Sequence, residues 1–358
     1  MSAHRTTIAD VARLAGVAAS TASLAFSGKG TVSDATRTRV LDAAAALDYA
    51  GPDPRAASLR TGRSGIGGVV LEEHLGVAFL DPVKTAMLDG LTEGIAPLGA
   101  GLLLLRDHEG EAGLETAPLD AVVLIGCSGR LQASLATVRR RGIPVIVIDG
   151  DAGEGIPQIT LDNRAATRQI AEYLHALGHR DVAIVTLPFQ AERTRRFLEA
   201  GTDDALITID ITRERLAGAR EVFPGAPAIA SAGSFIDEGL LAGRTLLADA
   251  ATRPAATRPT AIIAQSDLLA AGVIRAAEEL GLRVPDDVSV AGFDGITVDG
   301  LAPFELATMV QPATEIGRMA GASLVRMLDG ETPTSISMNC VFRMGNTTSA
   351  PRSSADCP

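Results

Sequence analysis

Four aspartates close short apolar runs along the chain, and their carboxylates are the first candidates for chemistry. Asp149 follows VIVI, Asp162 follows ITL, Asp267 follows IIAQS and Asp294 follows VAGF. An ionised carboxylate only accepts hydrogen bonds, so it suits the hydroxyl groups of a polar ligand. A helix cap or a turn is the alternative role for each aspartate taken singly. Because several carboxylates occupy such positions, we expect some of them to meet at one ligand site.

Residues 1–63 offer a different chemistry, directed at phosphate. The 358-residue chain has a net charge of −11, yet this segment holds Lys29 and seven arginines against five aspartates. The net charge of this segment is therefore +3, and the net charge of the remainder is −14. A small basic head on an acidic body is typical of a DNA-binding module joined to a regulatory domain.

The sequence shows no recognisable catalytic centre. It contains no nucleophile with a neighbouring base and no metal-binding cluster, and GRSGIGGVV lacks the G-x-G-x-x-G spacing of a phosphate loop. Cys127, Cys340 and Cys357 are scattered, which argues against a metal site or a disulfide framework and suits a reducing cytosol. We therefore expect no enzyme activity, no metal and no cofactor.

The chain also shows no sign of a membrane or an export route. Its N-terminus is polar and lacks the apolar region of a secretory signal. No apolar run reaches the ~18 residues of a membrane span. These patterns predict a cytoplasmic protein without a membrane partner.

Three short helices are predicted in the basic segment. Thr7 can cap the first, with Asp10 three residues on, and Gly16 supplies a left-handed stop. A second helix follows at roughly 18–26, and Ser33 caps a third. Their inner faces are apolar at helical spacing: Ile8, Val11, Ala12 and Ala15, then Val40, Ala43, Ala44 and Leu47. Two helices joined by a tight glycine turn and braced by a third predict a helix-turn-helix, with an ordinary three-helix cap as the alternative.

From Ile66 onward, apolar runs alternate with amphipathic stretches. The runs are IGGVVL, GLLLL, DAVVLIG, IPVIVID, DVAIVT, TAIIAQ and VSVAGFD. Continuous apolar runs separated by helical patterns predict buried parallel strands with crossover helices. Such α/β sheets bind ligands at the carboxyl ends of their strands, where the four aspartates stand.

The segments TIADVARLAGV, VSDATRTRV and LDYAGPDPRAASLRTGRSG resemble the head of the LacI/GalR family of bacterial transcriptional regulators, and the resemblance extends over the whole chain. It implies that the second helix lies in the major groove of operator DNA. The positions that match base-facing residues are Ala19, Ser20 and Leu24, and those that match backbone-facing residues are Thr21 and Ser23. Many members of the family have Arg where this chain has Leu24, and a capping Ser where it has Ala18.

The recognition face is therefore mostly apolar. It can contact thymine methyl groups, and Ser20 adds a hydroxyl, but it lacks the guanidinium fork that reads guanine. We expect phosphate contacts from Arg13, Lys29 or Arg37 to carry much of the affinity. A solvated surface charge is the alternative role for each of these three cations.

Residues 51–63, GPDPRAASLRTGR, have the composition of a flexible linker. The resemblance implies instead a hinge that folds into a short helix on operator DNA. Leu59 matches the leucine that wedges between base pairs in the minor groove, and Ala56 matches the small residue at which two hinge helices approach. The cost of unstacking the bases is offset by contacts to the bent duplex. Asp53 replaces the family's usual capping Asn, and Ala57 replaces a frequent minor-groove Arg.

The body resembles a periplasmic-binding-protein fold, in which two α/β subdomains enclose a cleft and the chain crosses between them three times. We place these crossings near Thr160, Gly292 and Ser323. The predicted organisation is a helix-turn-helix domain at 1–50, a hinge at 51–63, an N-terminal subdomain at 64–160 plus 293–323, a C-terminal subdomain at 161–292 plus 324–348, and a polar tail at 349–358.

The resemblance also identifies candidates for binding an effector. RERLAG contains the family's R-x-x-G, whose arginine is Arg215, and QSDLLAAGV matches N/S-D-x-x-A-x-G, whose aspartate is Asp267. A guanidinium offers a fixed fork of donors and a carboxylate accepts from a diol. Asp149 is a further candidate. Phe79 and Phe293 are candidates for apolar walls, with core packing as the alternative role for each, and segment 187–212 has no clear family motif.

The sequence thus predicts a sequence-specific DNA-binding transcriptional repressor controlled by a small polar effector, a sugar or sugar derivative before a nucleoside. We expect it to bind a pseudo-palindromic double-stranded operator as a homodimer, because no leucine heptad follows the last strand. A solute-binding receptor shares the body fold but has no use for residues 1–63, and an enzyme is the remaining alternative. Inducing and corepressing effectors use the same coupling with opposite sign.

Overall fold

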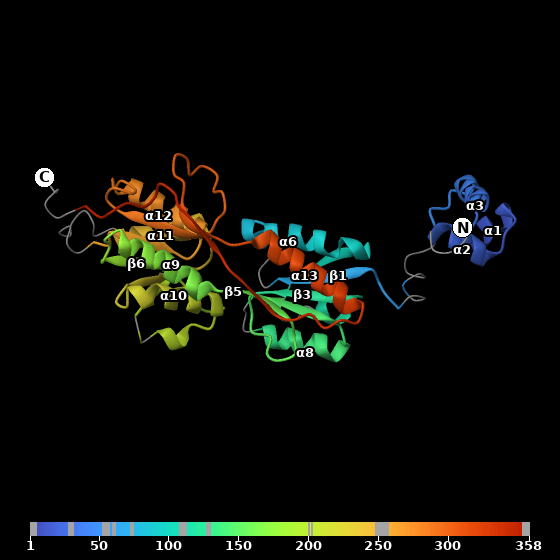
Figure 1. Ribbon diagram of the computed structural model, residues 1–358, viewed down its shortest axis with the longest axis horizontal. Helices are drawn as coiled ribbons and strands as arrows, with labels where there is room; N and C mark the ends of the chain where they lie inside the picture. Colours follow the sequence, from blue (N-terminus) through green and yellow to red (C-terminus); the bar gives the residue numbers. More distant parts are fainter. Residues whose placement is uncertain are drawn as a thin grey trace. The chain divides into compact units, whose positions relative to one another are not determined.

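The computed structural model describes residues 6–27, 32–51, 58, 62–71, 75–106, 113–126, 130–199, 201, 203–247 and 258–352. The chain divides into two compact units, Met1–Gly65 and Ile66–Pro358, which we call the head and the body (Figure 1). In the described part of the chain, no single helix is both long and apolar enough to cross a membrane. The helix pair Ile8–Ala15 and Ala19–Phe26 is apolar enough by composition but bends by 103° at its break.

The head contains the three predicted helices, α1 (Ile8–Ala15), α2 (Ala19–Ser27) and α3 (Asp34–Ala46). The Asp10 carboxylate accepts from the Thr7 backbone N–H at 3.0 Å, and Gly16 ends α1 in the left-handed region at φ 66°. The Ser33 hydroxyl accepts from the Thr36 N–H at the start of α3. The shared core is small and aliphatic: Val11, Ala12, Ala15, Ala22, Ala25, Val40, Ala43 and Ala44. The predicted caps and inner faces are confirmed.

The body holds two mainly parallel sheets, and the predicted fold class is confirmed. The first, which defines the N-terminal subdomain, has the order β12-β5-β4-β3-β1-β2. Its strands are β1 (Ile66–Leu71), β2 (Gly101–Arg106), β3 (Ala121–Ile125), β4 (Val145–Ile148), β5 (Gln158–Leu161) and β12 (Ile336–Met338). Its helices are α5 (Leu75–Ala78), α6 (Pro82–Ile95), α7 (Gly113–Thr116), α8 (Leu131–Arg141) and α13 (Ala313–Leu328), with the 3-10 turn Ala96–Leu98 after α6.

The second sheet defines the C-terminal subdomain and has the order β13-β11-β10-β9-β6-β8-β7. Its strands are β6 (Val182–Thr186), β7 (Arg196–Leu198), β8 (Ala228–Ala230), β9 (Ala261–Ala264), β10 (Ser289–Asp294), β11 (Ala307–Val310) and β13 (Val341–Arg343). Its helices are α9 (Asn163–Ala176), α10 (Asp210–Val222), α11 (Ile236–Leu247) and α12 (Asp267–Glu279), with a 3-10 turn at Asp204–Leu206. Among the strands that the structure describes, only the edge strands β13 and β7 of this sheet pair antiparallel to their neighbours.

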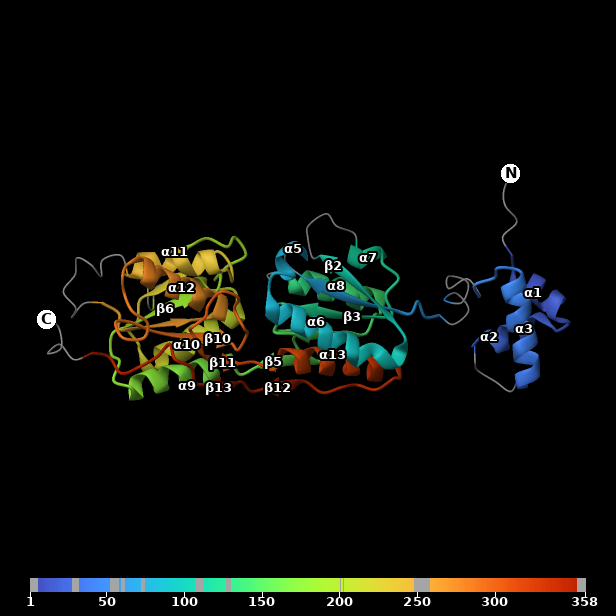
Figure 2. The same cartoon turned by 90° about the horizontal axis from the view of Figure 1, so that it is seen from above.

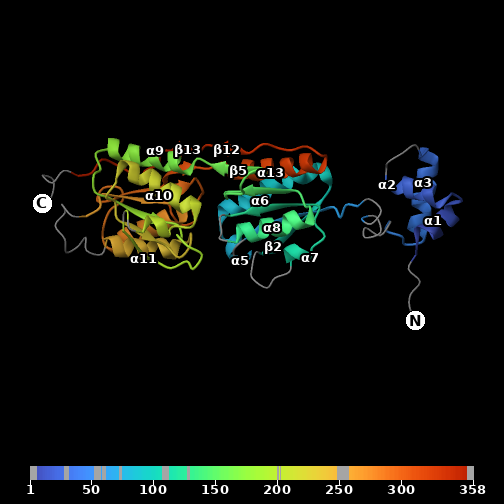
Figure 3. The same cartoon turned by 90° about the horizontal axis from the view of Figure 1, so that it is seen from below.

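Helices cover both faces of each sheet, so the central strands are fully buried. Figure 1 shows α6 and α13 over one face of the first sheet and α8 over the other. Figure 3 shows α9 and α10 on the opposite side of the second sheet from α11. This burial on both sides explains why the central strands read as continuous apolar runs.

Helices α6 and α13 approach at backbone distance because glycines face each other. A Cβ on Gly90 would overlap the carbonyl of Thr314, and a Cβ on Gly317 would overlap the carbonyl of Met87. Gly94 and Gly321 make the same close approach one turn along each helix. The two helices therefore form one tightly packed pair within the N-terminal subdomain.

Two of the three predicted crossings were wrong. Gly292 lies inside β10, and both β10 and β11 belong to the second sheet, so the chain returns only after Val310, into α13. Ser323 lies inside α13, and the last crossing follows β12, which ends at Met338. Residues 293–310 thus belong to the C-terminal subdomain and 324–338 to the N-terminal one. The apolar pattern identifies a strand but not the sheet it joins, which depends on pairing with distant strands.

Candidate functional site

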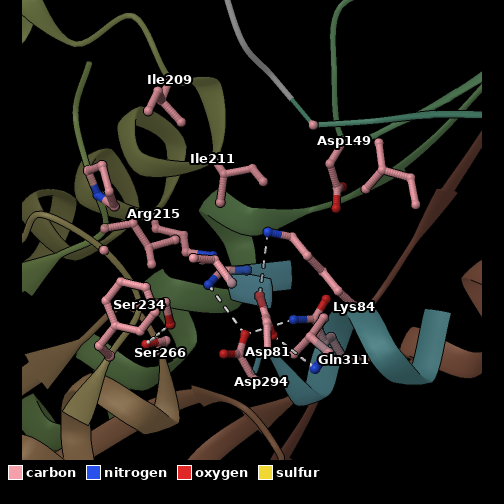
Figure 4. Close-up of a pocket in the computed structure, with 18 of the residues that line it drawn as sticks. Asp81, Lys84, Asp149, Ile209, Ile211, Arg215, Ser234, Ser266, Asp294 and Gln311 are labelled. Atoms are coloured by element: carbon pink, nitrogen blue, oxygen red, sulfur yellow. Dashed lines mark hydrogen bonds and ion pairs between the residues drawn. The ribbon is translucent and has the colours of Figure 1, made fainter. Parts of the chain in front are cut away.

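A cavity of about 190 Å³ lies between the two subdomains at the carboxyl ends of their parallel strands. Figure 4 shows polar side chains from both subdomains pointing into it. The polar lining is Asp81, Lys84, Asp149, Arg193, Arg215, Ser234, Ser266, Asp294 and Gln311. The apolar lining includes Val77, Met87, Leu187, Ile209, Ile211 and Phe235. This is the place where the sequence pattern predicted a ligand.

Arg215 is the fixed cation of the cavity. It projects from α10 and is only 3% exposed. Its Nε donates to Oδ1 of Asn163 at 2.8 Å and its Nη1 donates to the Gln265 carbonyl. Its Cζ lies 3.5 Å from the ring centroid of Phe293, so the guanidinium is stacked as well as hydrogen-bonded. The arginine fork is therefore held in one orientation before any ligand arrives.

Asp294 is the carboxylate closest to that fork. Its Oδ1 lies 3.6 Å from Nη1 of Arg215 and accepts from Nε2 of Gln311 at 2.7 Å (Figure 4). Burial raises the pKa of Asp294 well above its usual value, although the Arg215 charge opposes that shift. Asp294 ends β10 and Gln311 follows β11, so neighbouring strands deliver the two side chains to one place.

The N-terminal subdomain supplies two more carboxylates. Asp81 caps α6, where its Oδ1 accepts from the Val83 N–H at 3.0 Å and its Oδ2 lies 3.7 Å from Nζ of Lys84. Asp149 follows β4 in the left-handed region at φ 57°. Burial raises the pKa of Asp149 to about 6, against a lowering effect of Arg215 and of a backbone hydrogen bond from Leu161. Burial also raises the pKa of Asp81.

The structure does not bring Asp267 to the cavity, which corrects the prediction that it contacts the effector. Asp267 is 0% exposed. Its Oδ1 accepts from the Thr308 hydroxyl at 2.6 Å and its Oδ2 accepts from the Ile296 N–H at 2.9 Å. Both oxygens are thus engaged inside the C-terminal subdomain. The preceding residue, Ser266, lines the cavity instead.

The two predicted aromatic walls are also corrected. Phe79 follows α5 with 53% of its surface exposed, and it is not part of the cavity lining. Phe293 is 1% exposed and lies beneath Arg215, so it orients the guanidinium rather than contacting a ligand. The aromatic residue in the lining is Phe235, which the sequence analysis missed.

Other lining residues were missed although the sequence carried a signal for them. Gln311 closes the run ATMV in the same way that the four aspartates close theirs. Asp81 precedes a proline at the first position of α6, which is a typical helix start. Lys84 lies one turn further along that helix. Ser234 lies just before α11, where no apolar run points to it.

The arrangement can bind a small molecule that both donates and accepts hydrogen bonds. Carboxylates at Asp81, Asp149 and Asp294 accept, and the Arg215 fork and the Gln311 amide donate. Among the described residues, no group of three or more His, Cys, Asp and Glu side chains is arranged to hold a metal ion.

In the head, α2 presents one face to solvent and one to the core. Ala22 and Ala25 are buried, whereas Ala19, Ser20 and Leu24 are exposed, Leu24 by 43%. Thr21 and Ser23 lie between these two faces and are half-buried. Exposure leaves the three predicted base-facing side chains accessible to DNA, and base contact itself stays a prediction.

Comparison with known proteins assigns the family. Residues 7–51 match "Bacterial regulatory proteins, lacI family", and residues 171–343 match "Periplasmic binding protein-like domain". An HTH-type transcriptional regulator of Mycobacterium tuberculosis is 32% identical over 332 residues, covering 90% of this chain and 91% of the relative. The chain belongs to the LacI family. The HTH-type transcriptional regulator IpsA of Corynebacterium glutamicum is also 32% identical, over 356 residues covering 95% of this chain and 97% of IpsA.

Solved LacI-family structures share the fold. The lac repressor dimer bound to operator and the anti-inducer ONPF has a TM-score of 0.76 at 22% identity, covering 97% of this chain and 100% of that one. The complex of the regulator CelR with cellobiose has a TM-score of 0.65 at 24% identity, covering 96% of this chain and all of CelR. As a LacI-family member, the chain is a DNA-binding transcriptional regulator, with its head as the DNA-binding module.

In this LacI-family head, Arg13 and Arg37, which are predicted to contact DNA phosphates, differ in their exposure to solvent. Arg13 is exposed and forms an ion pair with Asp10 at 2.6 Å, whereas Arg37 is half-buried in α3. The predicted contacts of Lys29, Ala56 and Leu59 lie outside the described residues.

Proposed function

We propose that this LacI-family regulator is a repressor that binds a pseudo-palindromic operator as a homodimer, and that a small hydroxyl-rich effector, a sugar or sugar derivative, controls its operator affinity from the cavity of the body. The regulator acts by binding and not by catalysis, in the cytoplasm where bacterial DNA lies. The observation that carries the proposal is the orientation of Arg215, held by Asn163, Gln265 and Phe293 so that its fork faces Asp294 in the cavity.

The donor and acceptor pattern favours a polyol. A sugar hydroxyl both donates and accepts, so it pairs with a carboxylate on one side and a guanidinium on the other. The apolar residues between these groups suit the carbon–hydrogen face of a sugar ring. The related fold of CelR was solved with cellobiose, and that of a LacI-family regulator from Enterococcus faecium with ribose, which supports the same class of ligand.

The position of the cavity explains how a ligand could regulate. Asp81 and Asp149 come from the N-terminal subdomain, and Arg215 and Asp294 come from the C-terminal one. A ligand that touches all four favours one angle between the subdomains. If operator DNA favours a different angle, the ligand weakens operator binding, and the operator weakens ligand binding by the same free energy.

The test is a thermal-shift screen of ribose, glucose, cellobiose, their phosphates and a set of nucleosides. A ligand that binds only the folded protein stabilises it by about 2.7 kcal/mol at a hundredfold excess over its Kd. We expect a sugar to stabilise the wild type. Arg215→Ala and Asp294→Asn should each lower the affinity for that sugar at least about tenfold. Arg244→Ala is the matched control, because Arg244 pairs with Glu279 on the surface of α11 and α12, outside the cavity lining.

Operator binding completes the test. The same sugar must change the affinity for operator DNA obtained from genome-wide mapping of bound sites. A sugar that stabilises the wild type and both cavity variants equally would contradict the assignment of the cavity. A sugar that binds the cavity but leaves operator affinity unchanged would contradict its regulatory role.

A further inference from the structure

The turn that carries Asp294 has an unusual backbone. Asp294 lies at φ 116° and the next residue, Gly295, at φ 77°. A non-glycine residue at such a positive φ is strained and persists only where surrounding contacts hold it. A Cβ on Gly295 would overlap Val310, so β11 presses against the turn from one side. The position of Asp294 in the cavity therefore depends on what holds the turn 294–296.

Asp267 holds that turn from beneath. It is the first residue of α12, and its Oδ2 accepts from the Ile296 N–H at 2.9 Å. Its Oδ1 accepts from the Thr308 hydroxyl of β11 at 2.6 Å. Thr308 pairs with Gly292 in the β10–β11 register, and a Cβ on Gly292 would overlap Asp267 Oδ1. One buried carboxylate thus ties the turn after β10 to the neighbouring strand, in space that only glycine at 292 leaves open.

We propose that Asp267 is a positioning residue for the effector cavity, whose carboxylate fixes the turn 294–296 and so sets Asp294 opposite Arg215. The inference rests on the proposed function only in naming the cavity as the effector site. It assigns Asp267 a role without ligand contact, although its sequence motif pointed to direct contact.

The chemistry of the contact indicates which substitutions preserve it. The three groups that donate to Asp267, the Thr308 hydroxyl and the Ile296 and Gly295 N–H groups, are neutral. Burial raises the pKa of Asp267 to about 7, and these hydrogen bonds lower it. An asparagine could accept from Ile296 with its oxygen and donate to Thr308 Oγ1 with its amide. An alanine would leave the Ile296 N–H without its acceptor. The positioning role therefore predicts that Asp267→Asn retains the turn and that Asp267→Ala loses it.

The experiment measures amide hydrogen exchange in the full-length protein without ligand. The readout is the protection of the Ile296 amide relative to the Ile184 amide of β6, which bonds to the Pro227 carbonyl in the same subdomain. We expect Asp267→Ala and Gly292→Ala to lower this ratio about tenfold or more, Thr308→Val to lower it less, and Asp267→Asn to leave it within about threefold of wild type. The Arg215 Nε–H resonance, which senses the Phe293 ring and Asp294, should shift in the first two variants.

Thr347→Val is the matched control. Thr347 is as buried as Thr308 and its hydroxyl also bridges β10 and β11, to the Val290 carbonyl and from the Ala307 N–H, but it does not touch Asp267. Unchanged relative protection in Asp267→Ala and Gly292→Ala would overturn the proposal. An equal loss of Ile296 protection in Thr347→Val would also overturn it, since any damage to this sheet would then suffice. The exchange experiment uses no ligand, so its result does not depend on whether a sugar binds. Failure of the sugar screen would contradict the proposed function and not the positioning role of Asp267.

Discussion

Asp149 shows how a ligand site and a stable fold make opposite demands on one residue. Its carboxylate is buried in the cavity, and burial raises its pKa from 3.8 to about 6. Between these two values the folded state binds more protons than the unfolded chain does. The contribution of Asp149 to the free energy of unfolding is therefore present at low pH and is lost as pH rises through about 6.

We predict that Asp149→Asn stabilises the unliganded protein at pH 7.5 while weakening effector binding. The neutral amide removes a desolvated charge, which corresponds to an increase of about 1–3 kcal/mol in the free energy of unfolding. The increase should shrink towards zero below about pH 4, where the wild-type carboxyl is protonated in both states. Urea denaturation from pH 4 to 7.5 measures it, with the exposed Asp89→Asn of α6 as control. A difference that does not vary with pH would show that Asp149 does not titrate in this range.

At the residue scale, the sequence predicted a polar ligand site at the strand ends, but it identified only some of the residues that line the cavity. Asp267 and Asp294 both close apolar runs, and a sequence pattern treats them alike. They differ because Ser266 is the cap of α12, accepting from the Leu269 N–H, so the next residue, Asp267, turns inward under the strand ends. Asp294 belongs to the strand itself and reaches the cavity. A shift of one position along the chain therefore decides whether a side chain lines the cavity, as Ser266 does, or is buried beneath it, as Asp267 is.

At the scale of elements, the exposed face of α2 offers few hydrogen-bonding groups to DNA. Its outward side chains Ala19, Ser20 and Leu24 offer methyl groups and one hydroxyl, while Ala22 and Ala25 face the core. Alanines on the inner face let α2 lie close to α1 and α3. The helix is therefore fixed in place by small residues, and its outward face can be altered without disturbing the core.

We predict that Leu24→Arg changes the preferred operator. Arginine can make a bidentate contact to guanine, worth roughly 1–3 kcal/mol of discrimination, whereas leucine cannot. Selection from a random-sequence pool should therefore enrich a new guanine in each half-site. Leu41→Arg adds the same charge at an exposed position of α3 and serves as the control, with stronger overall binding but the wild-type consensus. An unchanged consensus with Leu24→Arg would show that position 24 does not face a base.

The longer strands were predictable from the sequence, and most of the shorter ones were not. The apolar runs found from the sequence include the central strands β1, β3, β4, β6, β9 and β10 and the edge strand β2, whereas the short central strands β5, β8 and β11 are not among them. The edge strands β7, β12 and β13 are three residues long and partly exposed, so they show no continuous apolar run. The last crossing was misplaced for the same reason, because β12 and β13 mark it and neither is visible in the pattern.

At the scale of the whole molecule, the DNA-binding module and the candidate effector cavity belong to separate compact units of the chain. Every residue of the cavity lies in the body, and the exposed face of α2 lies in the head. The segment that joins them contains the hinge predicted at 51–63. We therefore expect this segment to take part in communication between the two functions.

We predict that Leu59→Ala abolishes specific operator binding and leaves effector binding intact. Loss of a side chain that wedges between base pairs should cost more than about 1 kcal/mol of operator affinity, which is more than fivefold in Kd. Operator titration measures the first effect and the sugar thermal shift measures the second. Leu80→Ala, at an exposed position of the body, is the control. An operator affinity within about threefold of wild type would contradict the wedge.

The three crossings between the subdomains are bonded to one another. The Asp162 N–H donates to the Met338 carbonyl, which joins the first crossing to the third, and Val310 pairs with Val341, which joins the second to the third. Figure 2 shows β5, β12, β13 and β11 along this one edge of the body. Rotation about this edge is the motion that disturbs the bonds between the three crossings least. We therefore expect the two subdomains to rotate about this edge, so that a molecule held in the cavity would fix the angle between them.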